Sequence, residues 1–155
     1  MRALMTFTFL FWASLSAAQP LEPRDGWVIF PSDKQFDQLL DDVKSAVRAN
    51  GMAVVTQAGP TRAARNRGIT IPNNRVVGVF NNQFAVRILG LSTAAMIEAP
   101  VRLYLTEDNL GQTALYYKTP TFVFSAYYAE GGDELAAAAA AQLDAIFLVI
   151  AETAR

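Results

Sequence analysis

The side chains of this sequence that can do chemistry are carboxylates, amides, hydroxyls and cations, because its 155 residues include no histidine and no cysteine. Histidine is the commonest general base and the commonest neutral metal ligand. Cysteine supplies disulfides and thiolate metal sites. Most familiar catalytic mechanisms are therefore excluded. A site built from oxygen ligands alone would favour calcium or magnesium, but the sequence predicts neither a bound metal nor a cofactor.

The strongest chemical candidate is Glu98, a lone carboxylate in the apolar run MIEAPV. Such a carboxylate can act as a general base or a metal ligand. Asn81 or Asn82 can begin a helix and present N–H donors to an anion. Together these residues suggest a hydrolase or lyase in which Glu98 is the base and an asparagine is the polarising group. In the structural interpretation, which we prefer, Glu98 pairs with Arg87 or Arg102 and the asparagine is an ordinary helix cap.

Aromatic residues gather in the second half of the chain. Their rings and hydroxyls suit an apolar ligand pocket or a dimer interface, although we expect most of them in the core. The group comprises Tyr104, Tyr116, Tyr117, Phe122, Phe124, Tyr127 and Tyr128. The predicted ligand-binding set is Asn81, Asn82, Arg87, Glu98, Arg102, Tyr104 and Tyr116.

Charge is distributed unevenly along the chain. Residues 43–97 carry seven cations and no acid, whereas the segments on either side are acidic. The basic middle is either a solvated face or a site for a small anionic or amphipathic ligand. Nucleic acid is not an expected partner, because the formal net charge is −1 and such binding normally needs an overall basic surface.

The N-terminus has the pattern of a secretory signal peptide. Arg2 precedes an apolar run that ends at Trp12, and small residues precede Gln19. The run is shorter than the roughly twenty residues that span a bilayer, so we expect cleavage after Ala18, no stable membrane insertion, and a periplasmic or extracellular protein. The predicted division is a signal peptide over residues 1–18, a flexible segment over 19–25 and a single domain over 26–155.

Helical periodicity is clearest over residues 33–50. Ser32 and Gln35 fit a capping box, and Asn50-Gly51 supplies a stop signal. The apolar residues that recur on one helical face are Phe36, Leu39, Leu40, Val43, Ala46 and Val47. Lys34 lies off this face, so its truncation is expected to have little effect on stability.

A β-hairpin is predicted after Glu98. In residues 101–106 apolar side chains occupy every second position, the period of a half-buried strand. Glu107 and Asp108 are adjacent, so they point in opposite directions and cannot form a close dyad. We interpret them as turn residues. Gly111 can take positive φ, and QTALYY then forms the partner strand.

The remaining elements follow from shorter patterns, and Gly78 indicates a bulge or a close neighbour. In chain order they are a strand over 27–30 ended by Pro31, a strand over 52–58, a short helix over 59–68, a strand over 75–80, a helix that begins at Asn81 or Asn82 and ends at Gly90, and an alanine-rich helix over 133–153 capped by Asp133. The predicted order is β-α-β-(short α)-β-α-β-β-α, an α+β fold.

Three segments carry a family resemblance: GMAVV, AARNRGITIPNNRVVGVFNN, and IEAPVRLYLTED followed by a tyrosine-rich strand. From Gly51 to Pro120 the chain resembles the domain of unknown function 302 family. The resemblance implies a TATA-binding-protein-like fold, a curved antiparallel sheet with helices on one face, and a homodimer. It implies no activity. Where the family often has Asn-Pro the chain reads Asn81-Asn82 or Asn82-Gln83, and where it often has a polar Asp-His pair the chain reads QAGP. Any chemistry at those positions in relatives is therefore in doubt here.

These observations predict an exported, non-catalytic binding or accessory module, homodimeric, with a pocket between the sheet and the last helix. The alternative is the hydrolase or lyase that uses Glu98. The two hypotheses differ in the surroundings of Glu98. An enzyme needs a closed, dry concavity with donors nearby, whereas a binding module can hold Glu98 against an arginine.

Overall fold

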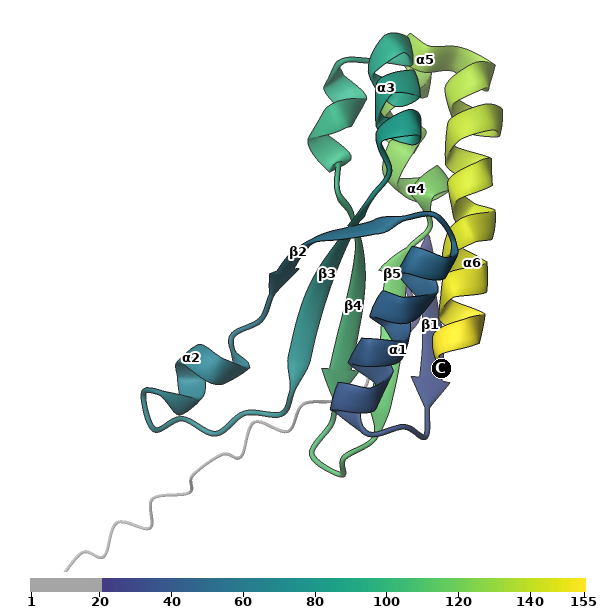
Figure 1. Cartoon of the computed structure of the whole chain (residues 1–155). Coiled ribbons are helices and arrows are strands. Elements are labelled where there is room, and N and C mark those ends of the chain that lie inside the picture. Colours follow the sequence, from purple (N-terminus) through teal and green to yellow (C-terminus); the bar gives the residue numbers. More distant parts are fainter. Residues whose placement is uncertain (1–20) are drawn as a thin grey trace, which may run out of the picture.

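The computed structural model describes residues 21–155, so the predicted signal peptide over residues 1–18 lies outside the described residues. The described chain is an α+β domain built on an open five-stranded antiparallel sheet in the order β1-β5-β4-β3-β2, with helices packed on one face (Figure 1). The predicted fold class is therefore confirmed. The strands are β1 (Trp27–Ser32), β2 (Ala53–Ala58), β3 (Asn74–Phe80), β4 (Val101–Glu107) and β5 (Thr113–Lys118).

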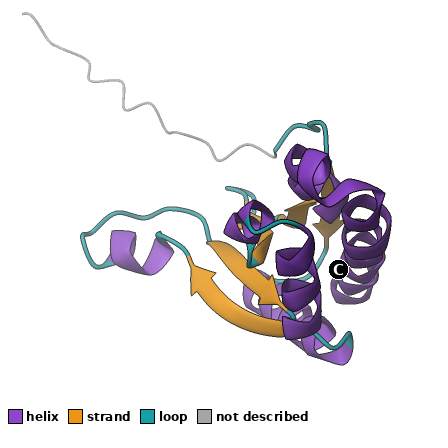
Figure 2. Cartoon of the chain, turned by 90° about the horizontal axis from the view of Figure 1, so that it is seen from above, coloured by secondary structure: helices purple, strands orange, loops and turns teal. Residues whose placement is uncertain are grey.

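Two longer helices, α1 (Phe36–Ala49) and α6 (Ala141–Ala154), pack against each other over the sheet. The short helix α2 (Thr61–Arg65) stands apart at the end of the curved β2–β3 pair (Figure 2). The other helical segments are α3 (Asn82–Leu91), η1 (Ala94–Glu98), α4 (Pro120–Phe124), η2 (Ser125–Tyr127), α5 (Tyr128–Glu134) and the π-helical η3 (Leu135–Ala140).

Helix α1 buries the face that its sequence predicts. All six apolar residues named above for this helix are buried, and Leu39, Val43 and Val47 are completely inaccessible to solvent. The helix begins later than predicted, because Ser32 remains in β1 and Gln35 is the N-cap without a side-chain hydrogen bond. The capping box is therefore not formed.

The core lies between the sheet and the layer of α1 and α6. Alternate residues of the central strands, such as Leu103 and Leu115, point into it and are fully buried. Phe147 and Ile150 of α6 cover them, also at 0% exposure. Burial of a side chain of this size stabilises the fold by about 1.5–3 kcal/mol, so this single layer accounts for much of the hydrophobic stabilisation.

The C-terminal helical region differs from the single helix predicted over residues 133–153. Helical structure begins earlier, with α4, which was not predicted, and Gly132 (φ 59°, ψ −156°) breaks α5 immediately before Asp133. A helical segment therefore starts after this break, next to the predicted start at Asp133. Earlier in the chain, Gly90 lies inside α3, which ends at Leu91 and not at the glycine.

Among residues 21–155, no single helix is long and apolar enough to cross a membrane. The pair Pro120–Glu134 and Ala138–Ala154 reaches that length and apolarity only when the two are taken together, and they are bent by 109°.

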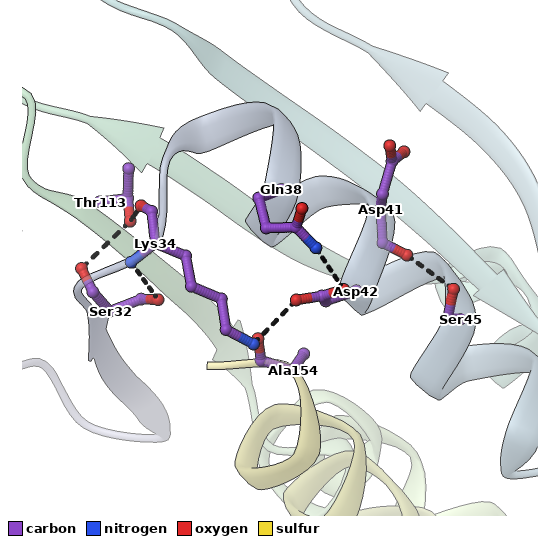
Figure 3. A network of polar contacts seen from close by, with 8 residues as sticks. All are labelled: Ser32, Lys34, Gln38, Asp41, Asp42, Ser45, Thr113 and Ala154. Atoms are coloured by element: carbon purple, nitrogen blue, oxygen red, sulfur yellow. Dashed lines mark hydrogen bonds and ion pairs between the residues drawn. The ribbon is translucent and has the colours of Figure 1, made fainter.

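Figure 3 shows a polar network that joins β1, α1, β5 and the end of α6. Lys34 Nζ lies 2.8 Å from Asp42 Oδ2 and donates to the carbonyl oxygen of Ala154, also at 2.8 Å. Thr113 Oγ1 donates to the carbonyl oxygen of Lys34 at 2.8 Å. Because Ala154 lies in the last turn of α6, the ammonium also caps that helix. These contacts revise the expectation that truncation of Lys34 has little effect.

The Lys34–Asp42 pair should make stability depend on pH. The hydrogen bond from Lys34 is the main reason that the pKa of Asp42 lies below its ordinary value. A lowered carboxyl pKa stabilises the fold at pH values above the unfolded pKa, and the contribution is lost as the pH falls through the folded pKa. Lys34→Met should therefore lower the free energy of unfolding at neutral pH, and its difference from wild type should narrow below about pH 4.

Urea unfolding at neutral and acidic pH measures both effects. The difference should not vanish in acid, because the bond from Lys34 to the Ala154 carbonyl oxygen does not titrate. Lys44→Met is the matched control, since Lys44 pairs with an Asp41 side chain that is 72% exposed and such pairs contribute little. Equal losses for the two variants at neutral pH would show that the network adds nothing beyond a surface ion pair.

Candidate ligand-binding groove

The sheet face opposite α1 and α6 carries two rows of side chains that run across the strands. The cross-strand register places them, because every second residue of each strand points to this face. We call the first the cationic row: Trp27, Lys118, Arg102, Gly78 and Thr56. We call the second the aromatic row: Ile29, Tyr116, Tyr104, Val76 and Ala58.

A groove of about 980 Å³ lies over this face. Three residues of the cationic row and four of the aromatic row line it, and its wall is formed by Phe122 and Val123 of α4 and Glu98 of η1. The lining residues of the two rows are Trp27, Arg102, Lys118, Ala58, Val76, Tyr104 and Tyr116. A smaller hollow of about 280 Å³ shares Glu98 and Arg102 with it. The pocket predicted between the sheet and the last helix is thus on the wrong face, because fully buried side chains such as Phe147 fill that space. A volume near the upper end of the roughly 300–1,000 Å³ usual for ligand sites makes this groove the candidate site.

Helix α4 is held in place by two side chains at its N-terminal end. Thr119 is its N-cap, accepting a hydrogen bond from the N–H of Phe122 at 3.2 Å, and Pro120 occupies the first turn. Asp144 of α6 accepts a hydrogen bond from the N–H of Thr121 at 2.8 Å and another from its hydroxyl at 2.5 Å. The wall of the groove is therefore tied to the core helix.

Gly26 allows the ring of Phe122 to lie against the backbone before Trp27. It has φ +73°, and an added Cβ would lie 2.1 Å from Phe122 Cγ. The carbonyl oxygen of Gly26 accepts a hydrogen bond from the N–H of Thr119 at 2.8 Å. Glycine is favoured at such a position both because φ is positive and because there is no room for a side chain. This contact fixes two aromatic residues at one end of the groove.

Glu98 is engaged by two neighbours. Its Oε1 accepts a hydrogen bond from Tyr127 Oη at 2.8 Å, and its Oε2 lies 3.8 Å from Arg102 Nη2. The hydrogen bond to Glu98 is also the main cause that raises the pKa of Tyr127. The Glu98 side chain is 26% exposed, so it lies at a partly open wall and not in a closed, dry concavity. This arrangement favours the structural interpretation of Glu98.

Tyr104 and Tyr116 form the centre of the aromatic row. Their ring centroids are 6.2 Å apart with planes tilted by 40°. Burial, followed by the proximity of Tyr116, raises the pKa of Tyr104, so its phenol stays neutral at physiological pH. The pair lines the groove with aromatic ring surface and two hydroxyls.

The other predicted site residues lie outside the groove. Asn81 caps α3 by accepting from the N–H groups of Gln83 and Phe84, and its amide donates to the carbonyl oxygen of Gly51 at 2.9 Å. Asn82 is exposed in the first turn of α3. Neither asparagine lines the groove with Glu98.

Arg87 is also directed elsewhere. Its Nη1 donates to the carbonyl oxygen of Ala138 at 3.1 Å, and its Nη2 lies 3.9 Å from Glu134 Oε1, so it joins α3 to the C-terminal helices.

Of the seven predicted residues, four meet in the groove: Glu98, Arg102, Tyr104 and Tyr116. Within residues 21–155, no group of three acidic side chains converges to hold a metal ion.

Trp27 and Lys118 also line the groove, although neither is among the predicted site residues. Both belong to the cationic row and face each other across β1 and β5. Alternation in TALYYK places Lys118 on the same face as Tyr116, which is a signal that the sequence does contain. Trp27 could not be placed in the same way, because its position depends on which strand pairs with β1.

The contacts of Glu98 predict a modest structural role. Glu98→Gln keeps an acceptor for Tyr127 but removes the charge that faces Arg102, so the free energy of unfolding should fall by less than about 1 kcal/mol. Chemical denaturation measures the change. Glu134→Gln, which loosens the more exposed pair with Arg87, should have a smaller effect. A Glu98→Gln protein with unchanged stability that loses all binding or turnover would instead favour the enzyme hypothesis.

Comparison with known proteins agrees with this architecture. Residues 28–149 match the family model described as "Domain of unknown function DUF302". The chain is also similar to the crystal structure of an uncharacterized conserved DUF302 protein from Bacillus stearothermophilus, with a TM-score of 0.73 and 16% identity over 85% of this chain and 100% of that one. At that identity the likeness shows the fold alone. No curated protein matches the sequence.

Proposed function

The chain belongs to the DUF302 family, and from that premise we propose that it is an exported, non-catalytic binding or accessory module whose ligand occupies the groove on the uncovered sheet face. The main support for this proposal is the lining of that groove, which combines aromatic rings with a few charged groups. Ligand sites are typically concave, mostly apolar and equipped with a small number of polar groups. An amphipathic ligand suits such a lining.

The hydrolase or lyase hypothesis receives less support. It needs Glu98 beside an asparagine that polarises the substrate, whereas Asn81 uses its side chain as a helix cap and as a donor to Gly51. Glu98 itself is held by Tyr127 and Arg102. A carboxylate held in this way is better suited to maintaining the groove wall than to abstracting a proton.

Export and self-association are further parts of the proposal. Export rests on the signal-peptide pattern, and mass analysis of protein from the periplasm of a Gram-negative host should give a chain that begins at or near Gln19. An intact Met1 in that fraction would contradict it.

The proposed homodimer rests on the family resemblance. Light scattering coupled to size-exclusion chromatography measures the subunit number directly.

Native mass spectrometry of the protein purified from its periplasm tests the binding function. The spectrum should show an added small-molecule mass. Ala58→Trp should remove this mass, because Ala58 lines the groove from β2 and a larger ring there would occupy the space. Ala53→Trp is the matched control on the same strand, at an exposed position outside the groove lining. The proposal would be contradicted if wild type showed no added mass, or if the added mass remained in Ala58→Trp.

A further inference from the structure

The cationic row carries positive charge that the surrounding side chains do not fully neutralise. The register pairs Leu103 with Tyr117, and Arg102 and Lys118 are the adjacent residues on the same two strands and the same face. Like charges at cross-strand positions repel each other. Within residues 21–155, Lys118 makes no ion pair, and the only acidic partner of Arg102 is Glu98 at 3.8 Å.

Glu98 offsets this charge in part. One of its oxygens is already bound to Tyr127 Oη, and the side chain of Arg102 is 62% exposed. The charged residues that line the groove are Glu98, Arg102 and Lys118, so the lining carries one excess positive charge. The Lys118 ammonium lies 5.8 Å from the centroid of the Trp27 ring, a cation–π contact that holds it at the end of the groove.

The aromatic row lies two residues farther along each strand, a separation of about 7 Å. It supplies apolar surface from Tyr104, Tyr116, Val76 and Ala58 next to the cationic row. A ligand that spans both rows therefore meets cations at one end and apolar side chains along the rest of its length. This polarity fixes the direction in which an amphipathic molecule can lie.

We propose that the groove takes an amphipathic monoanion, with a single terminal carboxylate at Lys118 and Arg102 and an apolar body over the aromatic row. The proposal rests on the proposed function and adds the chemical class of the ligand. One negative charge matches the single excess positive charge of the lining. The exposed Arg102 and Lys118 donate hydrogen bonds to the carboxylate, and charge-assisted bonds of this kind are the stronger ones.

Isothermal titration with molecules that share one apolar tail separates the contribution of the head group. Decanoate should bind about tenfold more tightly than decanol, and decylammonium should bind least. Acetate should show no measurable binding, because it lacks the apolar body. Trp27 fluorescence should change on addition of decanoate, and that change should be absent in Trp27→Phe.

Lys118→Gln tests the proposed contact between the exposed Lys118 and the ligand carboxylate. It should reduce decanoate affinity by about tenfold and leave decanol affinity unchanged, so the advantage of the acid disappears. Lys44→Gln, a lysine on α1 that pairs with Asp41, should change neither. Equal binding of decanoate and decanol to wild type, or an acid advantage that survives Lys118→Gln, overturns the ligand class and leaves the binding function standing. If none of the three decyl compounds binds and native mass spectrometry shows no retained mass, both the ligand class and the binding function are overturned.

Discussion

Replacement of Phe147 by alanine should lower the free energy of unfolding by about 3–5 kcal/mol, the usual cost of removing a buried phenylalanine ring. Phe147 is 0% exposed in the layer that α6 forms over the sheet. Its ring centroid lies 5.6 Å from that of Tyr117, with planes at 59°, so the variant also loses an aromatic contact. Because small domains are stable by only about 5–15 kcal/mol, this loss is a large fraction of the total.

Urea unfolding followed by circular dichroism measures the change, and Leu148→Ala is the matched control. Leu148 is the next residue on α6 and is 42% exposed, so its truncation should change stability by about 0.5 kcal/mol or less. Both variants place alanine in the same helix, so helix propensity does not explain a difference. Similar losses for the two would mean that α6 packs on the sheet through another face.

The parts of the fold that depend on local patterns were predictable. The buried face of α1 follows from the spacing of Phe36, Leu40 and Val43, and the β4–β5 hairpin follows from period-two alternation and Gly111. Both patterns are complete within about twenty residues, so they can be recognised without knowledge of distant contacts. The start of α1 was less predictable, because Ser32 can either cap a helix or continue a strand.

The parts that depend on distant contacts were not predictable. Helix α4 is five residues long, too short to be stable alone, and its N-terminal turn is bound by Asp144 from α6. The groove likewise depends on the pairing of β1 with β5, which brings Trp27 opposite Lys118. Arg102 and Tyr104 could be assigned to one strand face from sequence. That this face lacks a helical layer is a property of the whole topology.

A single added methyl group at Gly78 should destabilise the fold. It is buried in β3, opposite Arg102 of β4 and Thr56 of β2. A Cβ built there would lie 2.1 Å from Thr56 Oγ1 and 2.7 Å from Pro100 Cγ. The threonine can rotate, but the proline ring has no alternative position without movement of its backbone. Gly78→Ala should therefore lower the free energy of unfolding by about 1–3 kcal/mol through overpacking.

Gly90→Ala is the matched control, and its effect should have the opposite sign. Gly90 lies in α3, is exposed, and has no atom within 4 Å of an added Cβ. Alanine there removes the conformational freedom of glycine from the unfolded chain and should raise stability by about 0.5 kcal/mol. Thermal and urea unfolding of the two variants beside wild type measure both changes. Comparison of the two glycine-to-alanine variants thus distinguishes the effect of close packing on stability from the effect of backbone entropy. A Gly78→Ala protein as stable as wild type would mean that Pro100 does not restrict β3. A destabilised Gly90→Ala protein would mean that the exposed side of α3 is covered in solution.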